Sequence, residues 1–253
     1  MTVSFFYNYI VFPWIGLAVI TFVSLFFVSA PYGRHTRAGW GILINNRLSW
    51  IVMEIISPLT LSYYFLTGTT EKTAVMWIFV ALWWIHYFNR SLIFPFRIRS
   101  QNKHVPVLIT LLAMFFNSVN GFINGYYLGT LSPAYGLEWL YDPRFILGLL
   151  LFLLGFAINL QSDEILMNLR KPGETAYKIP QGGFYRYVSS PNYMGECIEW
   201  IGFAVLTWSL PGAAFALWTI ANLAPRAVFN HRWYLEMFED YPKNRKALIP
   251  FIV

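Results

Sequence analysis

Residues 145–169 read FILGLLLFLLGFAINLQSDEILMNL, and this run decides the fold class because it is apolar over most of its length. A helix that crosses the hydrocarbon core of a bilayer needs about 20 mainly apolar residues. The run meets this requirement, and it carries Asn159 and Asp163 toward its C-terminal end. We therefore expect a transmembrane helix with polar groups near one end.

The composition of the whole chain supports a membrane protein. Of its 253 residues, 57% are hydrophobic and 12% are charged, whereas a soluble domain carries about 25% charged residues. No linker, charge block or repeat divides the chain, so residues 1–253 are expected to form a single domain, and the one cysteine excludes an internal disulfide. We expect an all-α integral membrane protein, a bundle of seven transmembrane helices near residues 8–30, 44–66, 73–93, 105–128, 145–169, 193–209 and 211–237.

The basic residues give this bundle an orientation. Of the 18 Lys and Arg residues, only Lys72 and Arg144 fall on the side opposite the C-terminus. The positive-inside rule therefore predicts a cytoplasmic C-terminus and an N-terminus outside or in a lumen. The net charge of +6 follows the expected loops and forms no basic face of a soluble domain, so the expected partner is a lipid bilayer and not a nucleic acid.

Two glycine-containing stretches predict helix packing and a turn. In GFINGYYLG (residues 121–129), glycines recur every four residues, a spacing that allows membrane helices to approach closely. In WSLPG (residues 208–212), Pro211 and Gly212 are expected to form the turn between the last two helices.

Polar stripes on the last three expected spans indicate a ligand cavity. Ionisable groups inside a membrane are costly and usually face the interior of a bundle. Hydrogen bonds between helices are the alternative explanation, although three stripes with charged residues favour a cavity open to the cytoplasm. Helical spacing places three sets of residues on one face each: Asn159, Asp163 and Arg170; Asn192, Glu196 and Glu199; Arg226, Asn230 and Tyr234.

The connector LRKPGETAYKIPQGGFYRYVSSPNY (residues 169–193) combines glycines with basic residues and tyrosines. Ser190 is expected to cap the next helix, with Pro191 at its first position. Backbone amides, a helix N-terminus and cations suit phosphate groups, so we expect an anionic, phosphate-bearing cofactor, although a solvated basic loop is the plainer alternative. Neither a Rossmann nor a P-loop motif occurs, and no histidine or cysteine spacing indicates a metal site.

One carboxylate lies inside an apolar run of the second span. In WIVMEIISPLTL (residues 50–61), Glu54 is surrounded by residues that favour its neutral form. Trp50 lies one turn before Glu54, and Trp83 lies one turn before Tyr87 in the third span. Both tryptophans could line a site for a flat apolar ligand, and contact with lipid or core packing is an equally good explanation of either one.

Two long motifs resemble the steroid 5α-reductases, the 3-oxo-5α-steroid 4-dehydrogenase family. They are NLQSDEILMNLRKPGETAYKIPQGGFYRYVSSPNYMGECIEWIGF (residues 159–203) and PRAVFNHRWYLEMFEDYPKNRKALIPF (residues 225–251). The N-terminal half resembles the family more weakly, at PYGRHT (residues 31–36), at Glu54 and at IHYFNR (residues 85–90).

The resemblance implies a seven-helix membrane oxidoreductase that uses NADPH to reduce the 4,5 double bond of 3-oxo-4-ene steroids. It places the steroid among helices of residues 1–130, with Glu54 and Tyr87 hydrogen-bonded to the 3-keto oxygen. It places NADPH in residues 145–253, with Asn230 where some relatives carry His. Cofactor contacts carry over to Asn159, Asp163, Arg170, Tyr177, Asn192, Glu196, Arg226, Asn230 and Tyr234.

Several alternatives remain open at this point. Another membrane enone, enoyl or sterol double-bond reductase is a related possibility. An isoprenylcysteine-type methyltransferase would also bind a nucleotide-like cofactor in its last helices, and a sterol binder or transporter would need no chemistry. We expect a monomeric multi-pass protein of a bacterial inner membrane or of the endoplasmic reticulum, without a metal.

Overall fold

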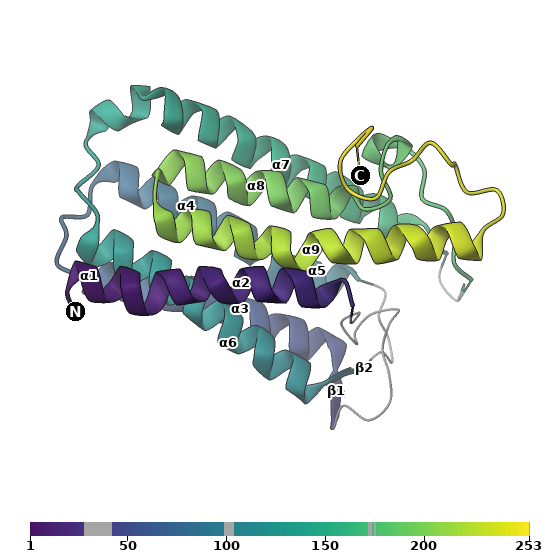
Figure 1. The fold of residues 1–253 in the computed structure, drawn as a ribbon, viewed down its shortest axis with the longest axis horizontal. Coiled ribbons are helices and arrows are strands. Elements are labelled where there is room, and N and C mark those ends of the chain that lie inside the picture. Colours follow the sequence, from purple (N-terminus) through teal and green to yellow (C-terminus); the bar gives the residue numbers. More distant parts are fainter. Residues whose placement is uncertain (28–41, 99–103, 172–173, 175, 253) are drawn as a thin grey trace. The chain divides into compact units, whose positions relative to one another are not determined.

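A computed structural model describes residues 1–27, 42–98, 104–171, 174 and 176–252. The motif PYGRHT (residues 31–36) and two residues of the connector motif KPGE (residues 171–174) lie outside the described residues. Figure 1 shows the helices and strands of the chain coloured along the sequence. The chain divides into two compact units, one of residues 1–13 and 30–146 and the other of residues 14–29 and 147–253. The assignment of the steroid to residues 1–130 and of NADPH to residues 145–253 stays a prediction.

The first unit contains three long helices and several short segments. Its long helices are α3 (Asn46–Thr67), α4 (Ala74–Phe88) and α6 (Val107–Tyr126). The shorter elements are α1 (Val3–Phe6), β1 (Leu43–Asn45), α5 (Phe94–Arg97), β2 (His104–Pro106), the 3-10 helix η5 (Leu137–Tyr141) and the π-helical segments η1 (Tyr7–Val11), η3 (Asn89–Ile93) and η4 (Tyr127–Leu131).

Glycines bring α3 and α6 into direct backbone contact, as their spacing predicted. A Cβ atom at Gly125 would lie 2.5 Å from the carbonyl oxygen of Leu61, and one at Gly121 would lie 2.6 Å from that of Ser57. Any larger residue would push the two helices apart. This close approach places the polar residues of α6 against the backbone of α3.

A pair of short strands departs from the all-α expectation. Strands β1 and β2 pair antiparallel, with Ile44 opposite Val105. They directly precede α3 and α6, so the packing of these helices brings the two preceding segments together. Their backbone groups then satisfy one another in place of water.

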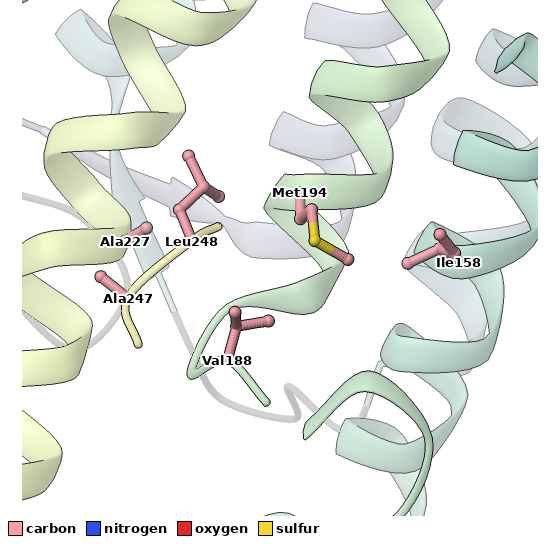
Figure 2. Packing of buried hydrophobic residues seen from close by; sticks show 6 residues of the cluster. All are labelled: Ile158, Val188, Met194, Ala227, Ala247 and Leu248. Carbon is pink, nitrogen blue, oxygen red and sulfur yellow. The ribbon is translucent and has the colours of Figure 1, made fainter. Parts of the chain in front are cut away.

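The described part of the second unit contains four α-helices, two of which begin in the first unit. It contains most of α2 (Phe12–Leu25), α7 (Pro143–Asn168) from Leu147 onward, the 3-10 helix η6 (Gly183–Arg186), α8 (Pro191–Thr207) and α9 (Leu210–Met237). The indole of Trp218 on α9 donates to the carbonyl oxygen of Trp14 on α2, 3.0 Å away. Figure 2 shows an apolar cluster that joins α7, α8 and α9 to the connector and the C-terminal segment, formed by Ile158, Met194, Ala227, Val188, Ala247 and Leu248.

Four helical stretches are long and apolar enough to cross a membrane, among the described residues: Val3–Leu25, Asn46–Thr67, Val107–Leu131 and Pro143–Asn168. This confirms an α-helical, multi-pass membrane protein. Helices α4 and α8 coincide with predicted spans but are shorter, with 15 and 17 residues, and α9 carries charged residues in its C-terminal half. The count of seven spans and the orientation therefore stay predictions.

Three local predictions need correction. Ser190 is the N-cap residue of α8 and Pro191 begins the helix, both as expected, but the Ser190 side chain makes no cap hydrogen bond. Pro211 and Gly212 lie in the first turn of α9, where proline is tolerated, and the chain reverses at Trp208 with φ of 43°. Helix α7 ends at Asn168, so Arg170 does not continue the helical stripe of Asn159 and Asp163.

Candidate functional site

In the first unit, α3 and α4 supply the two residues expected to bind a keto oxygen. Glu54 is half-buried on α3, and Tyr87 is 3% exposed on α4. The Tyr87 ring stacks on Trp83 with centroids 5.6 Å apart, and the Trp83 indole donates to Ser57 Oγ on α3 at 3.2 Å. This stack fixes the ring of Tyr87 relative to α3.

An asparagine of α6 links these two helices. Asn117 is buried, its Nδ2 donates to the carbonyl oxygen of Met53 at 2.6 Å, and its Oδ1 accepts from the Tyr87 hydroxyl at 3.2 Å. Met53 precedes Glu54 in the chain, so one amide joins the backbone beside Glu54 to the phenol of Tyr87. The first unit thus has a buried polar contact that joins α3, α4 and α6.

Trp50, expected beside the substrate, lies in an aromatic and cationic stack. The guanidinium of Arg90 lies 4.7 Å from the ring centroid of Trp50 and 4.7 Å from that of Phe94. The Trp50 and Phe94 rings meet edge to face at 5.1 Å. A cation over an indole face is favourable, so this stack holds Trp50 in place.

In the second unit, α7 and α8 bring three of the predicted cofactor residues together. Asn159 Nδ2 donates to the carbonyl oxygen of Asn192 at 3.0 Å, and Asn192 Nδ2 donates to Asp163 Oδ1 at 3.1 Å. A Cβ atom at Gly195 would lie 2.6 Å from the Asn159 backbone nitrogen, so this glycine allows the close approach of the two helices.

Asn159 has an open acceptor. The residue is 1% exposed, and its Oδ1 has no hydrogen-bond partner among the described residues. A buried carbonyl oxygen without a partner is costly, because it loses the hydrogen bonds that water gave it. A ligand with an N–H or O–H group at this position would remove that cost.

Helix α9 adds contacts to the start of α8. The Arg226 guanidinium lies 5.3 Å from the ring centroid of Tyr193. Asn230 Nδ2 donates to Ser190 Oγ at 3.4 Å, which gives the Ser190 hydroxyl a partner outside its own helix. Glu196 is half-buried one turn further along α8.

Two tyrosines of the predicted set lie in aromatic stacks. Tyr234 on α9 stacks on Tyr241, with centroids 5.1 Å apart and planes within 9°. Tyr177 in the connector meets Trp233 at 4.8 Å, and the Arg170 guanidinium lies 5.5 Å from the Tyr177 centroid. Arg170 therefore belongs to the connector surface and not to the α7 stripe.

The C-terminal segment holds the connector in place, a role that sequence reasoning did not find. Arg245 is 2% exposed and donates to the Pro180 carbonyl oxygen at 3.0 Å and to Gln181 Oε1 at 2.9 Å. The backbone of Ser189 donates to the carbonyl oxygen of Lys246 at 2.8 Å. The IPQGG motif was a visible signal, but its partner lies more than sixty residues later in the chain.

The exposed part of the connector has its own ion pair. Lys178 Nζ donates to Glu174 Oε2 at 2.5 Å, and the Lys171 backbone N–H donates to the same oxygen at 2.9 Å. The hydrogen bond from Lys178 is the main reason that the pKa of the Glu174 carboxyl lies below its ordinary value, and the bond from the Lys171 backbone adds to this effect. The positive charge of Lys178 thus offsets the negative charge of Glu174, in a connector that we expect to bind an anion.

Comparison with known proteins identifies the family. The family described as 3-oxo-5-alpha-steroid 4-dehydrogenase matches residues 103–253. The chain is 44% identical to cattle (Bos taurus) 3-oxo-5-alpha-steroid 4-dehydrogenase 1, over 94% of this chain and 93% of that protein. It is 41% identical to the steroid 5-alpha-reductase DET2 of Gossypium hirsutum, over 93% of each, and 42% identical to the human 3-oxo-5-alpha-steroid 4-dehydrogenase 1, over 88% and 86%. The resemblance is thus confirmed, and the chain belongs to the 3-oxo-5-alpha-steroid 4-dehydrogenase family.

Proposed function

We propose that the protein reduces the 4,5 double bond of 3-oxo-4-ene steroids to 5α-dihydrosteroids, with NADPH as the reductant. The observation that carries this proposal is the near full-length similarity to relatives named for this reaction. The buried phenol of Tyr87 and the carboxyl of Glu54, both in apolar helices, support it. They are hydrogen-bonding groups that suit a ligand with one polar end.

The second unit would hold the nicotinamide dinucleotide. Asn159 Oδ1 would accept an N–H from the bound group, because it is buried without a partner among the described residues. Arg170 and Arg226 would meet its phosphates, and Asp163, Tyr177, Asn192, Glu196, Asn230 and Tyr234 would complete the site. When bound, the reduced nicotinamide supplies the hydride that reaches C5 of the steroid.

Tyr87 and Glu54 would act on the opposite end of the enone. Hydride addition at C5 moves negative charge onto the 3-keto oxygen, so a donor aimed at that oxygen stabilises the transition state more than the ground state. The Tyr87 phenol would donate its single proton, and Glu54 would donate in its neutral form, which the apolar run around it favours. The resulting enolate then takes a proton at C4.

The membrane arrangement belongs to the same proposal. Seven spans, with a cytoplasmic C-terminus, would put the basic connector and the C-terminal segment on the side where NADPH is present. The uneven placement of basic residues supports this orientation. The bacterial inner membrane and the endoplasmic reticulum are both compatible with it.

Turnover by the purified protein tests the proposal. Protein in detergent, given NADPH and testosterone or progesterone, should consume NADPH and form the 5α-dihydro product, detected by mass spectrometry. Absence of product across a panel of 3-oxo-4-ene steroids would overturn the steroid assignment. Protection from heat by S-adenosylmethionine in place of NADPH would instead favour a methyltransferase.

A further inference from the structure

Asn117 contacts the phenol that would act as a donor in the proposed reaction. Its amide is oriented by the 2.6 Å bond from Nδ2 to the Met53 carbonyl oxygen, which leaves Oδ1 facing the Tyr87 hydroxyl. An amide oxygen only accepts, and a phenol has one proton, so Tyr87 must donate to Asn117. In the ligand-free protein, the proton therefore points at Asn117.

The two bonds of Asn117 differ in length. The bond to Met53 is short for N–H···O, whereas the 3.2 Å from the Tyr87 hydroxyl to Oδ1 is long for O–H···O, which centres near 2.7 to 2.8 Å. The amide is thus firmly anchored on α3, and the phenolic proton is loosely held. A stronger acceptor could take that proton while the amide stays in place.

We propose that Asn117 is a positioning and specificity-determining residue, whose Oδ1 competes with the steroid 3-keto oxygen for the proton of Tyr87. The inference rests on the proposed function, since it assumes that Tyr87 donates to the substrate. When the keto oxygen takes the proton, Asn117 Oδ1 loses its donor inside the protein. The loss of this hydrogen bond makes the binding free energy of a 3-keto ligand less favourable.

The competition favours ligands whose oxygen is a good acceptor. A ligand without oxygen at C3 cannot take the proton, so it leaves the bond between Tyr87 and Asn117 intact. A 3-keto ligand gains the phenol as a donor and must displace Asn117 to do so. Asn117 therefore lowers the affinity for 3-keto ligands in particular.

Replacement of Asn117 should not separate the helices. Gly121 and Gly125 keep their backbone contacts with α3, and Ser49 Oγ remains 2.7 Å from Thr110 Oγ1 as a second polar link. Asn117→Leu keeps the approximate size of the side chain and removes both the acceptor and the donor. Asn117→Val is a smaller variant without an acceptor, for use if the first does not fold.

The test measures the dissociation constant of testosterone in the presence of NADP⁺, which permits binding without turnover. Asn117→Leu should bind testosterone roughly threefold to tenfold more tightly, the range of one neutral hydrogen bond. The gain should be absent for a 3-deoxy analogue, and absent in a Tyr87→Phe background, where Asn117→Leu should change affinity less than about twofold. Asn124→Leu, on the same helix, is the control for burying a leucine, because the amide of Asn124 donates to the Asn120 carbonyl oxygen of its own helix.

Unchanged or weaker testosterone binding in Asn117→Leu and Asn117→Val would overturn the inference, as would an equal gain in the Tyr87→Phe background. The proposed function has a separate readout, because it requires wild-type turnover and its loss in Tyr87→Phe. If turnover and its dependence on Tyr87 hold while the affinity gain does not appear, the inference alone fails. If the wild-type protein reduces no steroid, both fail.

Discussion

Two buried asparagines, one in each unit, show how differently the two regions are prepared for a ligand. Asn117 in the first unit and Asn159 in the second both donate Nδ2 to a backbone carbonyl oxygen of a neighbouring helix, at 2.6 Å and 3.0 Å. Their Oδ1 atoms differ. That of Asn117 accepts from Tyr87, and that of Asn159 has no partner among the described residues.

We call Asn117 with Tyr87 and Met53 the closed centre, because its acceptor has a donor inside the protein. We call Asn159 with Asn192 and Asp163 the open centre, because Asn159 Oδ1 has no donor among the described residues. In the first unit the polar groups satisfy one another, so a substrate must displace an internal hydrogen bond to bind. In the second unit Asn159 Oδ1 is buried without a donor among the described residues, so a ligand that donates to it removes the free-energy cost of that unsatisfied group. We expect the first region to discriminate among ligands and the second to bind its ligand with little rearrangement.

The largest expected effect comes from removing the donor of the closed centre. Tyr87→Phe should lower kcat by about 100-fold, because a donor to a developing oxyanion contributes at this level. Glu54→Gln should also slow turnover strongly, since an amide is a much weaker acid than a neutral carboxyl group. NADPH affinity, measured by fluorescence titration, should stay within about twofold in both variants.

The control is Tyr63→Phe, because Tyr63 is 62% exposed on the same helix as Glu54. Its kcat should equal that of the wild type. A near-normal kcat for Tyr87→Phe or Glu54→Gln would contradict the assigned roles. Such a result would also show that the closed centre has no role in turnover.

Removing the open acceptor should have the next largest effect. Asn159→Leu should raise the dissociation constant of NADPH about tenfold, since one buried hydrogen bond to the ligand is lost. Calorimetry in detergent would measure this, with kcat at saturating NADPH expected to change little. Ser162→Ala is the matched control, because the buried Ser162 hydroxyl donates to the Ile158 carbonyl oxygen of its own helix at 2.6 Å. An unchanged affinity in Asn159→Leu would mean that the open acceptor is not part of the site.

The sequence was sufficient for the family, the membrane class and the helix positions, because these depend on local patterns. The apolar run of residues 145–169 corresponds closely to α7, and the glycine spacing of residues 121–129 correctly predicted a close approach of helices, although not that the partner is α3. The stripe of Asn159 and Asp163 was also correct, since both meet Asn192.

Features that depend on tertiary contacts could not be predicted in this way. Asn117 lies in an apolar span and could have been noticed as a polar group, but its partners Met53 and Tyr87 belong to other helices. Arg245 follows a run of polar residues that reads as an ordinary basic tail. Helical spacing also placed Arg170 on the α7 stripe, and the helix end at Asn168 overruled it.

A smaller effect on NADPH affinity is expected when the hydrogen bonds between Arg245 and the connector are weakened. Arg245→Lys keeps the charge but cannot donate to Pro180 and Gln181 as a planar fork does. It should raise the NADPH dissociation constant roughly threefold to fivefold and lower the free energy of unfolding by about 2 kcal/mol. Arg232→Lys, on the exposed face of α9, is the control and should change neither quantity. Equal effects in both variants would show that the connector does not depend on Arg245.

The smallest effect concerns the start of α7, the helix that carries Asn159. Asp142 accepts from the Arg144 backbone N–H at 2.8 Å and from its guanidinium at 2.8 and 2.7 Å. These bonds to Arg144 lower the pKa of Asp142 from 3.8 to about 2. Because the pKa is lower in the folded protein, the stabilisation is complete above about pH 4 and is lost as the pH falls through about 2.

Asp142→Asn should therefore lower the melting temperature by roughly 1 to 2 °C at neutral pH, as expected for an exposed pair. The difference from the wild type should shrink as the pH falls from about 4 toward 2, because the wild-type carboxyl then also becomes neutral. NADPH affinity should not change, since Asp142 acts at the helix start and Asn159 lies several turns away. A loss of NADPH affinity as large as that of Asn159→Leu would show that the placement of α7 controls binding, and not the open acceptor of Asn159.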